Sequence, residues 1–160
     1  KRPGHIFGPY SSPSEFIACG RFKVSVATKD SAVVLGKYGV PARGDKAFSD
    51  LRVGDYDLVL LPGGHEAPDR VRQEPSVLKF IGDMHRAGKL VAALCHGPWI
   101  LISAGIMRGK RATCYIGMAD DLKNAGAHYE ETSVVEDDNI ITSPHYRYNG
   151  DFMKAILAKF

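Results

Sequence analysis

The chain has 160 residues, a formal net charge of +3 and 44% hydrophobic residues. This length fits one domain over residues 1–160 and leaves no room for a second full domain. The 21 basic residues nearly balance the 18 acidic ones, and no basic cluster is interleaved with aromatics, so we expect no nucleic-acid partner. The longest apolar runs are far shorter than the roughly 20 residues that span a bilayer, so we expect no membrane partner.

The cysteines and the first residues of the chain suggest in which cellular compartment the protein is found. Cys19, Cys95 and Cys114 form no CxxC pair and cannot all pair with one another, which favours a reducing environment. No secretory pattern opens the chain, so we expect a cytoplasmic protein. The sequence also lacks HxxxH, GxGxxG and Walker motifs and therefore predicts neither a metal site nor a nucleotide cofactor.

Three β-branched or continuous apolar runs predict strands, at residues 24–28, 57–61 and 90–94. Continuous hydrophobicity is typical of parallel strands that are buried on both faces. Between the last two runs, residues 75–87 place apolar side chains at i, i+3, i+4 and i+7, which predicts an amphipathic helix. Strand, helix and strand with short connections form a crossover unit, so the fold class is α/β with a mostly parallel sheet.

The rest of the chain continues this alternation. We expect a helix over 98–104, a strand over 111–115, a helix over 119–125, a hairpin of 133–136 with 140–143, and a last helix over 151–159. The hairpin follows from the Asp-Asp-Asn sequence between its strands, which suits a tight turn. The last helix should cover the sheet.

The segment AALCHG places Cys95 between a buried strand and a helix that Pro98 begins. A sharp strand-to-helix turn lifts a nucleophile clear of the sheet and needs small neighbours, which Ala93 and Gly97 provide. Proximity to the helix N-terminus should lower the pKa of the Cys95 thiol. His96 could then act as a general base or as the cationic partner of the thiolate. The alternative is that Cys95 is a small buried hydrophobe and His96 is incidental.

A glycine turn should lie beside this elbow. Pro62, Gly63 and Gly64 end the neighbouring buried strand, so they belong to the same carboxyl edge of the sheet, where open α/β folds place their sites. The backbone amides of Gly64 and His96 could form an oxyanion hole there.

Several motifs over residues 57–160 carry a family resemblance. LLPGG, APDRVR, VAALCHGPWILISAG, RGKRATCY, DDLKNAGA and NIITS resemble the PfpI family of the ThiJ/PfpI superfamily. The resemblance implies a flavodoxin-like three-layer sandwich of the class I glutamine amidotransferase-like kind, with Cys95 as nucleophile and His96 as its partner. It also implies that Asp69 reaches the histidine of a neighbouring subunit, in a homodimer or larger homo-oligomer with a shared active site. Tyr115 matches a tyrosine near the family's site, although it could equally be a packed strand aromatic.

The N-terminal region departs from the family pattern. Family members carry a glutamate after their first strand that hydrogen-bonds the cysteine, and the register set by Pro13 and the 24–28 strand puts it near residues 5–8, where no acid occurs. Glu15 lies too far along the chain to match this glutamate. The first strand is central in such a sheet. We therefore expect either an incomplete or misread N-terminal sequence or a much shortened strand over residues 5–7.

Two further histidines belong to the candidate region. His65 follows the Gly-Gly turn and either lines the pocket or is a solvated loop residue. His145 follows a strand end at the same edge of the sheet. Neither one forms a metal-ligand pattern.

The leading functional hypothesis is a cofactor-free cysteine enzyme, a PfpI-type peptidase-like hydrolase that acylates on a peptide carbonyl. The alternative is a glyoxalase III or protein deglycase, in which the thiolate forms a hemithioacetal with a small 2-oxoaldehyde such as methylglyoxal. The missing glutamate, the family's usual proton shuttle for aldehydes, favours the hydrolase. A different class is a non-enzymatic stress chaperone or cysteine redox sensor. A flavin carrier is disfavoured because no phosphate loop is present.

Overall fold

The computed structural model describes residues 4–7, 22–36, 39 and 41–160. Its strands are β1 (Gly4–Phe7), β2 (Lys23–Thr28), β3 (Val33–Leu35), β4 (Pro41–Arg43), β5 (Lys46–Ala47), β6 (Leu58–Leu61), β7 (Leu90–Leu94), β8 (Arg111–Ala112), β9 (His128–Tyr129), β10 (Val135–Asp137) and β11 (Ile140–Ser143). Its α-helices are α2 (Glu66–Val71), α3 (Pro75–Arg86), α4 (Pro98–Ser103), α5 (Ala119–Asn124) and α6 (Asn149–Leu157). Four 3-10 turns complete the set: η1 (Phe48–Asp50), η2 (Val53–Asp55), η3 (Ile116–Met118) and η4 (Tyr146–Tyr148).

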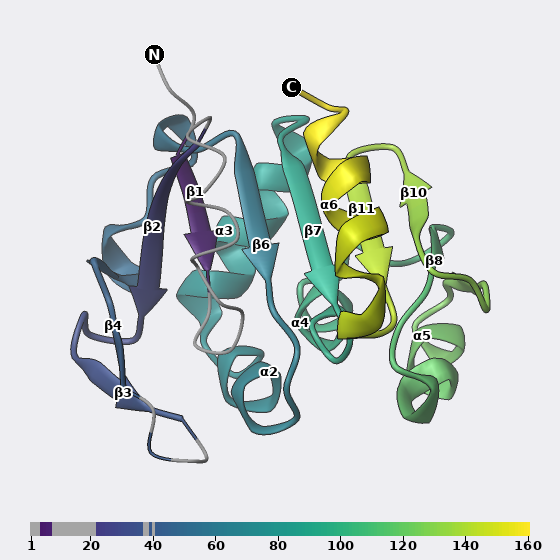
Figure 1. The fold of residues 1–160 in the computed structure, drawn as a ribbon, viewed down its shortest axis with the longest axis horizontal. Coiled ribbons are helices and arrows are strands. Elements are labelled where there is room, and N and C mark those ends of the chain that lie inside the picture. Colours follow the sequence, from purple (N-terminus) through teal and green to yellow (C-terminus); the bar gives the residue numbers. More distant parts are fainter. Residues whose placement is uncertain (1–3, 8–21, 37–38, 40) are drawn as a thin grey trace.

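A seven-stranded sheet forms the centre of the molecule, in the order β10-β11-β7-β6-β1-β2-β5 (Figure 1). Every neighbouring pair is parallel except β10 with β11, which is the predicted hairpin. Asp138 turns this hairpin with a positive φ of 57°, a conformation that aspartate tolerates better than most residues. The mostly parallel α/β sheet predicted from the sequence is confirmed.

The two faces of the sheet pack against different helices. Because side chains alternate along a strand, Val59 and Val91 lie in a core with α3 and α4, whereas Leu58 and Leu90 lie in a core with α6. Figure 1 shows α6 across β7 and β11, with α3 behind the sheet. Every residue of β6 and β7 is buried, as their continuous apolar runs indicated. The result is the expected three-layer sandwich.

The first strand is short and lies inside the sheet. β1 spans Gly4–Phe7 and pairs in parallel with β2 on one side and β6 on the other. The shortened strand considered for residues 5–7 is therefore present. Pro13 and Glu15, on which the alignment of the family glutamate depends, lie outside the described residues.

One predicted strand is longer in the prediction than in the structure. The strand expected over 111–115 ends at Ala112 and pairs with β9 in a separate two-stranded sheet. The strand ends because the backbone N–H of Thr113 donates to a side chain, Thr142 Oγ1 at 2.9 Å, instead of to a backbone carbonyl of a paired strand. The other predicted elements agree with the structure to within about two residues. In the part of the chain that the structure describes, no helix is long and apolar enough to cross a membrane.

Candidate active site

Cys95 occupies the turn between β7 and α4. Its φ is +60°, in the left-handed region that non-glycine residues rarely adopt, a strain of about 1–3 kcal/mol that the surrounding structure must hold in place. Two hydrogen bonds do so: the Cys95 N–H donates to the Ser143 carbonyl at 2.8 Å, and the Tyr115 N–H donates to the Cys95 carbonyl at 2.9 Å. The strand-to-helix elbow predicted from AALCHG is therefore present.

Close packing around the elbow requires glycine at two positions. A Cβ added at Gly63 would lie 2.6 Å from Cys95 Cβ, and one added at Gly97 would lie 2.5 Å from the Leu61 carbonyl oxygen. Gly64 has a φ of +91°, which suits glycine alone. The β6 and β7 ends thus approach each other so closely that Gly63 and Gly64 lie against the cysteine.

Three polar groups from two residues, His96 and Gly64, surround the Cys95 sulfur. His96 Nδ1 lies 3.3 Å from Sγ, and hydrogen bonds from the backbone N–H groups of Gly64 and His96 lower the pKa of the thiol. Burial acts in the opposite direction and is the larger effect, so the pKa of Cys95 is raised above its ordinary value. The expectation of a lowered pKa is wrong. The helix is only six residues long and starts three residues after the cysteine, so its dipole is weak at the sulfur.

The imidazole of His96 is held in an aromatic cluster. It stacks on Tyr115 with ring centroids 4.6 Å apart and meets Trp99 and His65 edge-on at 5.0 and 5.4 Å. Burial, with a smaller contribution from His65, lowers the pKa of His96. His96 is therefore neutral at pH 7 and can accept a proton from the thiol.

Sequence reasoning missed Trp99, which holds this cluster together. Its indole N–H donates to Asp121 Oδ2 at 2.8 Å, and the Arg72 guanidinium lies 5.5 Å above its ring. Arg72 in turn donates to Ser103 Oγ at 2.9 Å. The signal was available, because residues three apart at the start of a helix share a face, and Trp99 follows His96 by three.

The remaining predicted site residues differ in exposure and in their contacts with this cluster. Tyr115 is 39% exposed and is a rim residue, not a core aromatic. His65 is exposed yet touches the cluster through His96 and Trp99. Asp69 is exposed on α2, and within the described residues no hydrogen bond or ion pair joins its carboxylate to His96. His145 follows β11 at the same edge of the sheet.

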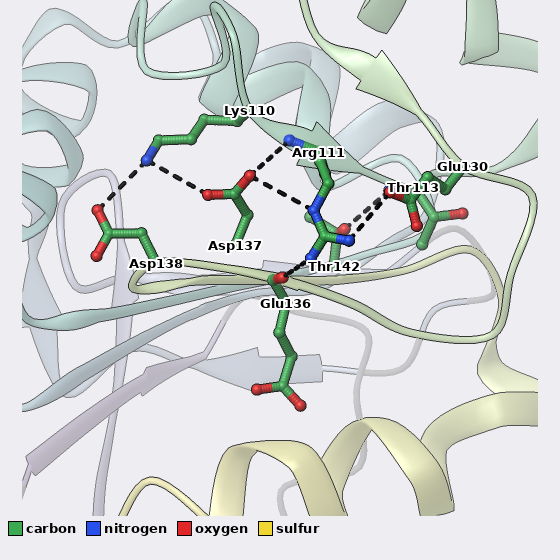
Figure 2. A network of polar contacts seen from close by, with 8 residues as sticks. All are labelled: Lys110, Arg111, Thr113, Glu130, Glu136, Asp137, Asp138 and Thr142. Atoms are coloured by element: carbon green, nitrogen blue, oxygen red, sulfur yellow. Dashed lines mark hydrogen bonds and ion pairs between the residues drawn. The ribbon is translucent and has the colours of Figure 1, made fainter.

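A polar network fixes the segment that carries Tyr115 (Figure 2). Asp137 accepts the Arg111 backbone N–H at 2.8 Å and pairs with Lys110 at 3.5 Å. The Arg111 guanidinium donates to the Glu136 carbonyl at 2.8 Å. The network joins residues 110–113 to the β10–β11 hairpin and so limits the movement of Tyr115 relative to Cys95.

The described residues hold no group of three or more His, Cys, Asp and Glu side chains arranged for a metal ion. Cys114, the other described thiol, is fully buried, and burial raises its pKa to about 12. Cys95 is therefore the accessible thiol of this region.

Comparison with known proteins identifies the family. The model of the DJ-1/PfpI family matches residues 9–159. The chain belongs to the DJ-1/PfpI family. Deglycase PfpI of Pyrococcus furiosus is 38% identical over 138 residues, covering 84% of this chain and 82% of that protein. Protein/nucleic acid deglycase 2 of Escherichia coli is 36% identical over 137 residues, covering 84% and 79%.

The family fold is confirmed by a crystal structure. A two-domain Anabaena variabilis protein with DJ-1/ThiJ/PfpI-like and ferritin-like domains superposes with a TM-score of 0.90 at 32% identity. The superposition covers 98% of this chain and 48% of that longer one. The PfpI resemblance and the flavodoxin-like fold inferred from the sequence are both confirmed for this DJ-1/PfpI chain.

Proposed function

We propose that this protein is a cysteine-dependent enzyme that attacks the carbonyl carbon of a 2-oxoaldehyde or its adduct, as a deglycase or glyoxalase III. The observation that carries the proposal is the environment of Cys95 Sγ, with a neutral imidazole 3.3 Å away and two backbone N–H donors directed at it. Two relatives at 36–38% identity are named deglycases, which supports aldehyde chemistry. A third, at 37% identity, is named a putative cysteine protease, YraA of Bacillus subtilis, so the peptidase that the sequence alone favoured is the alternative.

The first chemical step follows from this geometry. His96 Nδ1 takes the thiol proton while Sγ bonds to the aldehyde carbon, and the carbonyl oxygen gains the electron pair. In this proposal the Gly64 and His96 N–H groups, which hydrogen-bond Sγ before the reaction, stabilise this oxygen. The proton then passes from His96 to the oxygen, which leaves a hemithioacetal and a neutral imidazole. With an adduct, Sγ bonds to the former aldehyde carbon as the bond from that carbon to the substrate's nitrogen or sulfur breaks, and the proton passes from His96 to the leaving amine or thiol.

The second step converts the hemithioacetal without an external oxidant. A proton leaves the former aldehyde carbon and is returned to the neighbouring ketone carbon, while the hydroxyl proton of the hemithioacetal is transferred to the ketone oxygen, so that one carbon is oxidised and the other reduced. The product is the thioester of a 2-hydroxy acid on Cys95. Water cleaves this thioester, which releases the acid and restores the thiol. His96 is the described base nearest the sulfur.

The site is further proposed to be shared between two copies of the chain. Asp69 is exposed and has no hydrogen bond or ion pair to His96 among the described residues, which leaves its carboxylate available to a neighbouring copy. A carboxylate on the imidazole would stabilise the protonated His96 that forms when the thiol is consumed. We propose that a homo-oligomer is the active form.

The raised pKa of Cys95 disfavours a pure redox sensor. Sensor cysteines react with peroxide because they are largely thiolate at neutral pH, whereas burial keeps Cys95 protonated until a base removes the proton. A cysteine that depends on His96 suits turnover better than passive oxidation.

The test measures D-lactate formation from methylglyoxal beside cleavage of a fluorogenic peptide, with wild type, Cys95→Ser and His96→Ala purified identically. We expect the aldehyde activity to disappear in both variants. Peptide cleavage alone would assign the hydrolase, and absence of both activities would favour the sensor or chaperone.

Complementation tests the shared site. Asp69→Asn and Cys95→Ser should each be inactive. Mixed oligomers should regain activity, because a subunit with Cys95 would receive Asp69 from its neighbour. Full activity of Asp69→Asn, or of a monomer proven by light scattering, would contradict the shared site.

A further inference from the structure

A groove of about 470 Å³ opens next to the elbow, and we call it the Tyr115 groove. Residues from three segments line it: 113–116, 129–133 and 144–148. One of these segments is hydrogen-bonded to the backbone of the nucleophile, and another begins beside a residue that is. The Tyr115 N–H donates to the Cys95 carbonyl, and the third segment continues directly from Ser143, whose carbonyl accepts the Cys95 N–H. Cys95 and His96 are not among the lining residues, but Tyr115 both lines the groove and stacks on His96, so the groove lies beside the proposed catalytic pair.

The Tyr115 groove is larger than a three-carbon aldehyde requires. Its volume falls in the range of roughly 300–1,000 Å³ that holds a drug-sized ligand. Two of its lining residues expose large apolar side chains: Tyr115 at 39% and Ile116 at 60%. Exposed apolar clusters with tyrosine are typical of binding surfaces. These features indicate that the group carrying the reacting carbonyl is itself large.

Arg147 gives the groove a cation prepared for a ligand. Its backbone N–H and its Nε both donate to His145 Nδ1, at 3.2 and 3.3 Å, and its guanidinium lies 6.0 Å over the Tyr148 ring. These contacts hold the side chain by its inner nitrogen. Within the described residues its two terminal nitrogens have no carboxylate partner, and they match the two oxygens of a carboxylate.

A negative charge lies on a different segment of the groove. Glu131 comes from the 129–133 segment and is exposed, and no ion pair joins it to Arg147 among the described residues. A groove with separated charges of opposite sign, hydroxyl groups and tyrosine rings fits an extended polypeptide, which offers backbone polar groups and charged side chains at intervals.

We propose that the Tyr115 groove binds the polypeptide that bears the reacting carbonyl, and that Arg147 selects a carboxylate near that carbonyl. The inference rests on the proposed function and adds its substrate class: adducts on acidic segments of peptides or proteins. Glu131 acts against a uniformly acidic segment and favours a basic or neutral residue at its own end of the groove.

Binding tests the proposal independently of turnover. Two fluorescein-labelled peptides of equal length, one with glutamates flanking a central alanine and one with lysines, are titrated against Cys95→Ser and followed by anisotropy. We expect the acidic peptide to bind at least about tenfold more tightly, which is the effect of one charge-assisted hydrogen bond. In the Cys95→Ser protein, a second substitution, Arg147→Gln, should remove the preference for the acidic peptide, and Arg147→Glu should reverse it.

Matched variants complete the test. In the same Cys95→Ser protein, Arg86→Gln changes an exposed arginine on α3 and should leave the preference for the acidic peptide unchanged. Glu131→Gln should strengthen binding of the acidic peptide. Equal binding of the two peptides, or a preference that survives Arg147→Glu, would overturn the proposal. So would a change in oligomer mass in Arg147→Gln, because a second copy would then cover the groove.

Turnover separates the two proposals, with the same two peptides made with cysteine in place of the central alanine so that methylglyoxal forms an adduct on its thiol. If Arg147 controls binding but Cys95→Ser retains wild-type turnover, the proposed chemistry fails and the groove assignment stands. If turnover needs Cys95 but wild type does not distinguish acidic from basic peptides, the chemistry stands and the groove assignment fails.

Discussion

The imidazole of His96 stacks on the phenol ring of Tyr115, with centroids 4.6 Å apart and an interplanar angle of 25°. The backbone N–H of the same tyrosine donates to the carbonyl of Cys95. Tyr115 thus contacts both members of the proposed catalytic pair, through its ring and through its backbone. Replacing its side chain leaves the backbone contact and removes only the stack, so the two roles can be separated.

Tyr115→Leu should reduce kcat by roughly tenfold or more, because a small misplacement of a catalytic group is costly. Tyr115→Phe keeps the ring and should stay within about twofold of wild type. The measurement is kcat with methylglyoxal, beside a thermal melt that shows both variants folded. A leucine variant with wild-type kcat would mean that the stack does not orient His96.

The raised pKa of Cys95 predicts the pH dependence of its reactivity. Because burial raises the pKa of the thiol, the thiolate forms only as the pH rises past the ordinary cysteine value of about 8.5. The rate of alkylation by iodoacetamide should therefore keep increasing above that pH. Mass spectrometry should show Cys95 modified and Cys114 unmodified in the folded protein, since Cys114 is fully buried. A plateau near pH 6 would show that the thiolate is far more stable than the burial suggests.

Much of the elbow could be predicted from local sequence. Cys95 between an apolar run and Pro98 has one structural solution, and Gly63 and Gly97 are the residues that this solution needs. The environment of the Cys95 sulfur was harder to predict from the sequence. The pKa of Cys95 depends on the balance between burial of the thiol and the hydrogen bonds from the Gly64 and His96 N–H groups. The sequence predicts these donors, but it does not show how deeply the thiol is buried.

Contacts between segments that are distant in the sequence could not be predicted either. Arg147 and Glu131 belong to one groove because β11 and the 129–133 segment converge beside Tyr115, and no pattern in either segment indicates that meeting. The strand predicted over 111–115 failed for the same reason, since the side chain of Thr142 takes the hydrogen bond that would have extended it.

The network in Figure 2 predicts a difference between two neighbouring acids. Asp137 accepts a backbone N–H from Arg111 and pairs with Lys110, whereas the 65% exposed Asp138 pairs only with Lys110 in the network drawn. Asp137→Ala should lower the free energy of unfolding at pH 7 by about 1–3 kcal/mol. Asp138→Ala should change it by less than about 1 kcal/mol.

The effect of Asp137 should also depend on pH. The hydrogen bond from the Arg111 backbone lowers the pKa of Asp137, with Lys110 adding to the effect. A carboxyl whose pKa is lowered by folding contributes stability above its unfolded pKa of about 3.9 and loses it as the pH falls through the folded value. Urea unfolding at pH 7 and pH 3 should show the wild type and Asp137→Ala converging at the lower pH. A constant difference would assign the effect to packing.

The glycines at the elbow should separate stability from activity. Gly97→Ala places a methyl group 2.5 Å from the backbone oxygen of Leu61, and that oxygen cannot move without distorting β6. We expect a loss of about 1–3 kcal/mol or more. Gly150→Ala has no atom within 4 Å of the added carbon and lies in α6, so it should be neutral or stabilising by up to about 1 kcal/mol.

Gly63→Ala is the more informative change, because its added carbon would meet Cys95 Cβ at 2.6 Å and Sγ at 3.4 Å. The side chain of the nucleophile can shift where a backbone oxygen cannot, so the variant should fold with a smaller loss of stability than Gly97→Ala. The shift moves Sγ relative to His96 Nδ1 and should reduce kcat by at least about tenfold. Thermal melts and methylglyoxal turnover on the three variants provide the comparison. Wild-type kcat in a folded Gly63→Ala protein would mean that the position of Sγ in this structure is not the one used in the reaction.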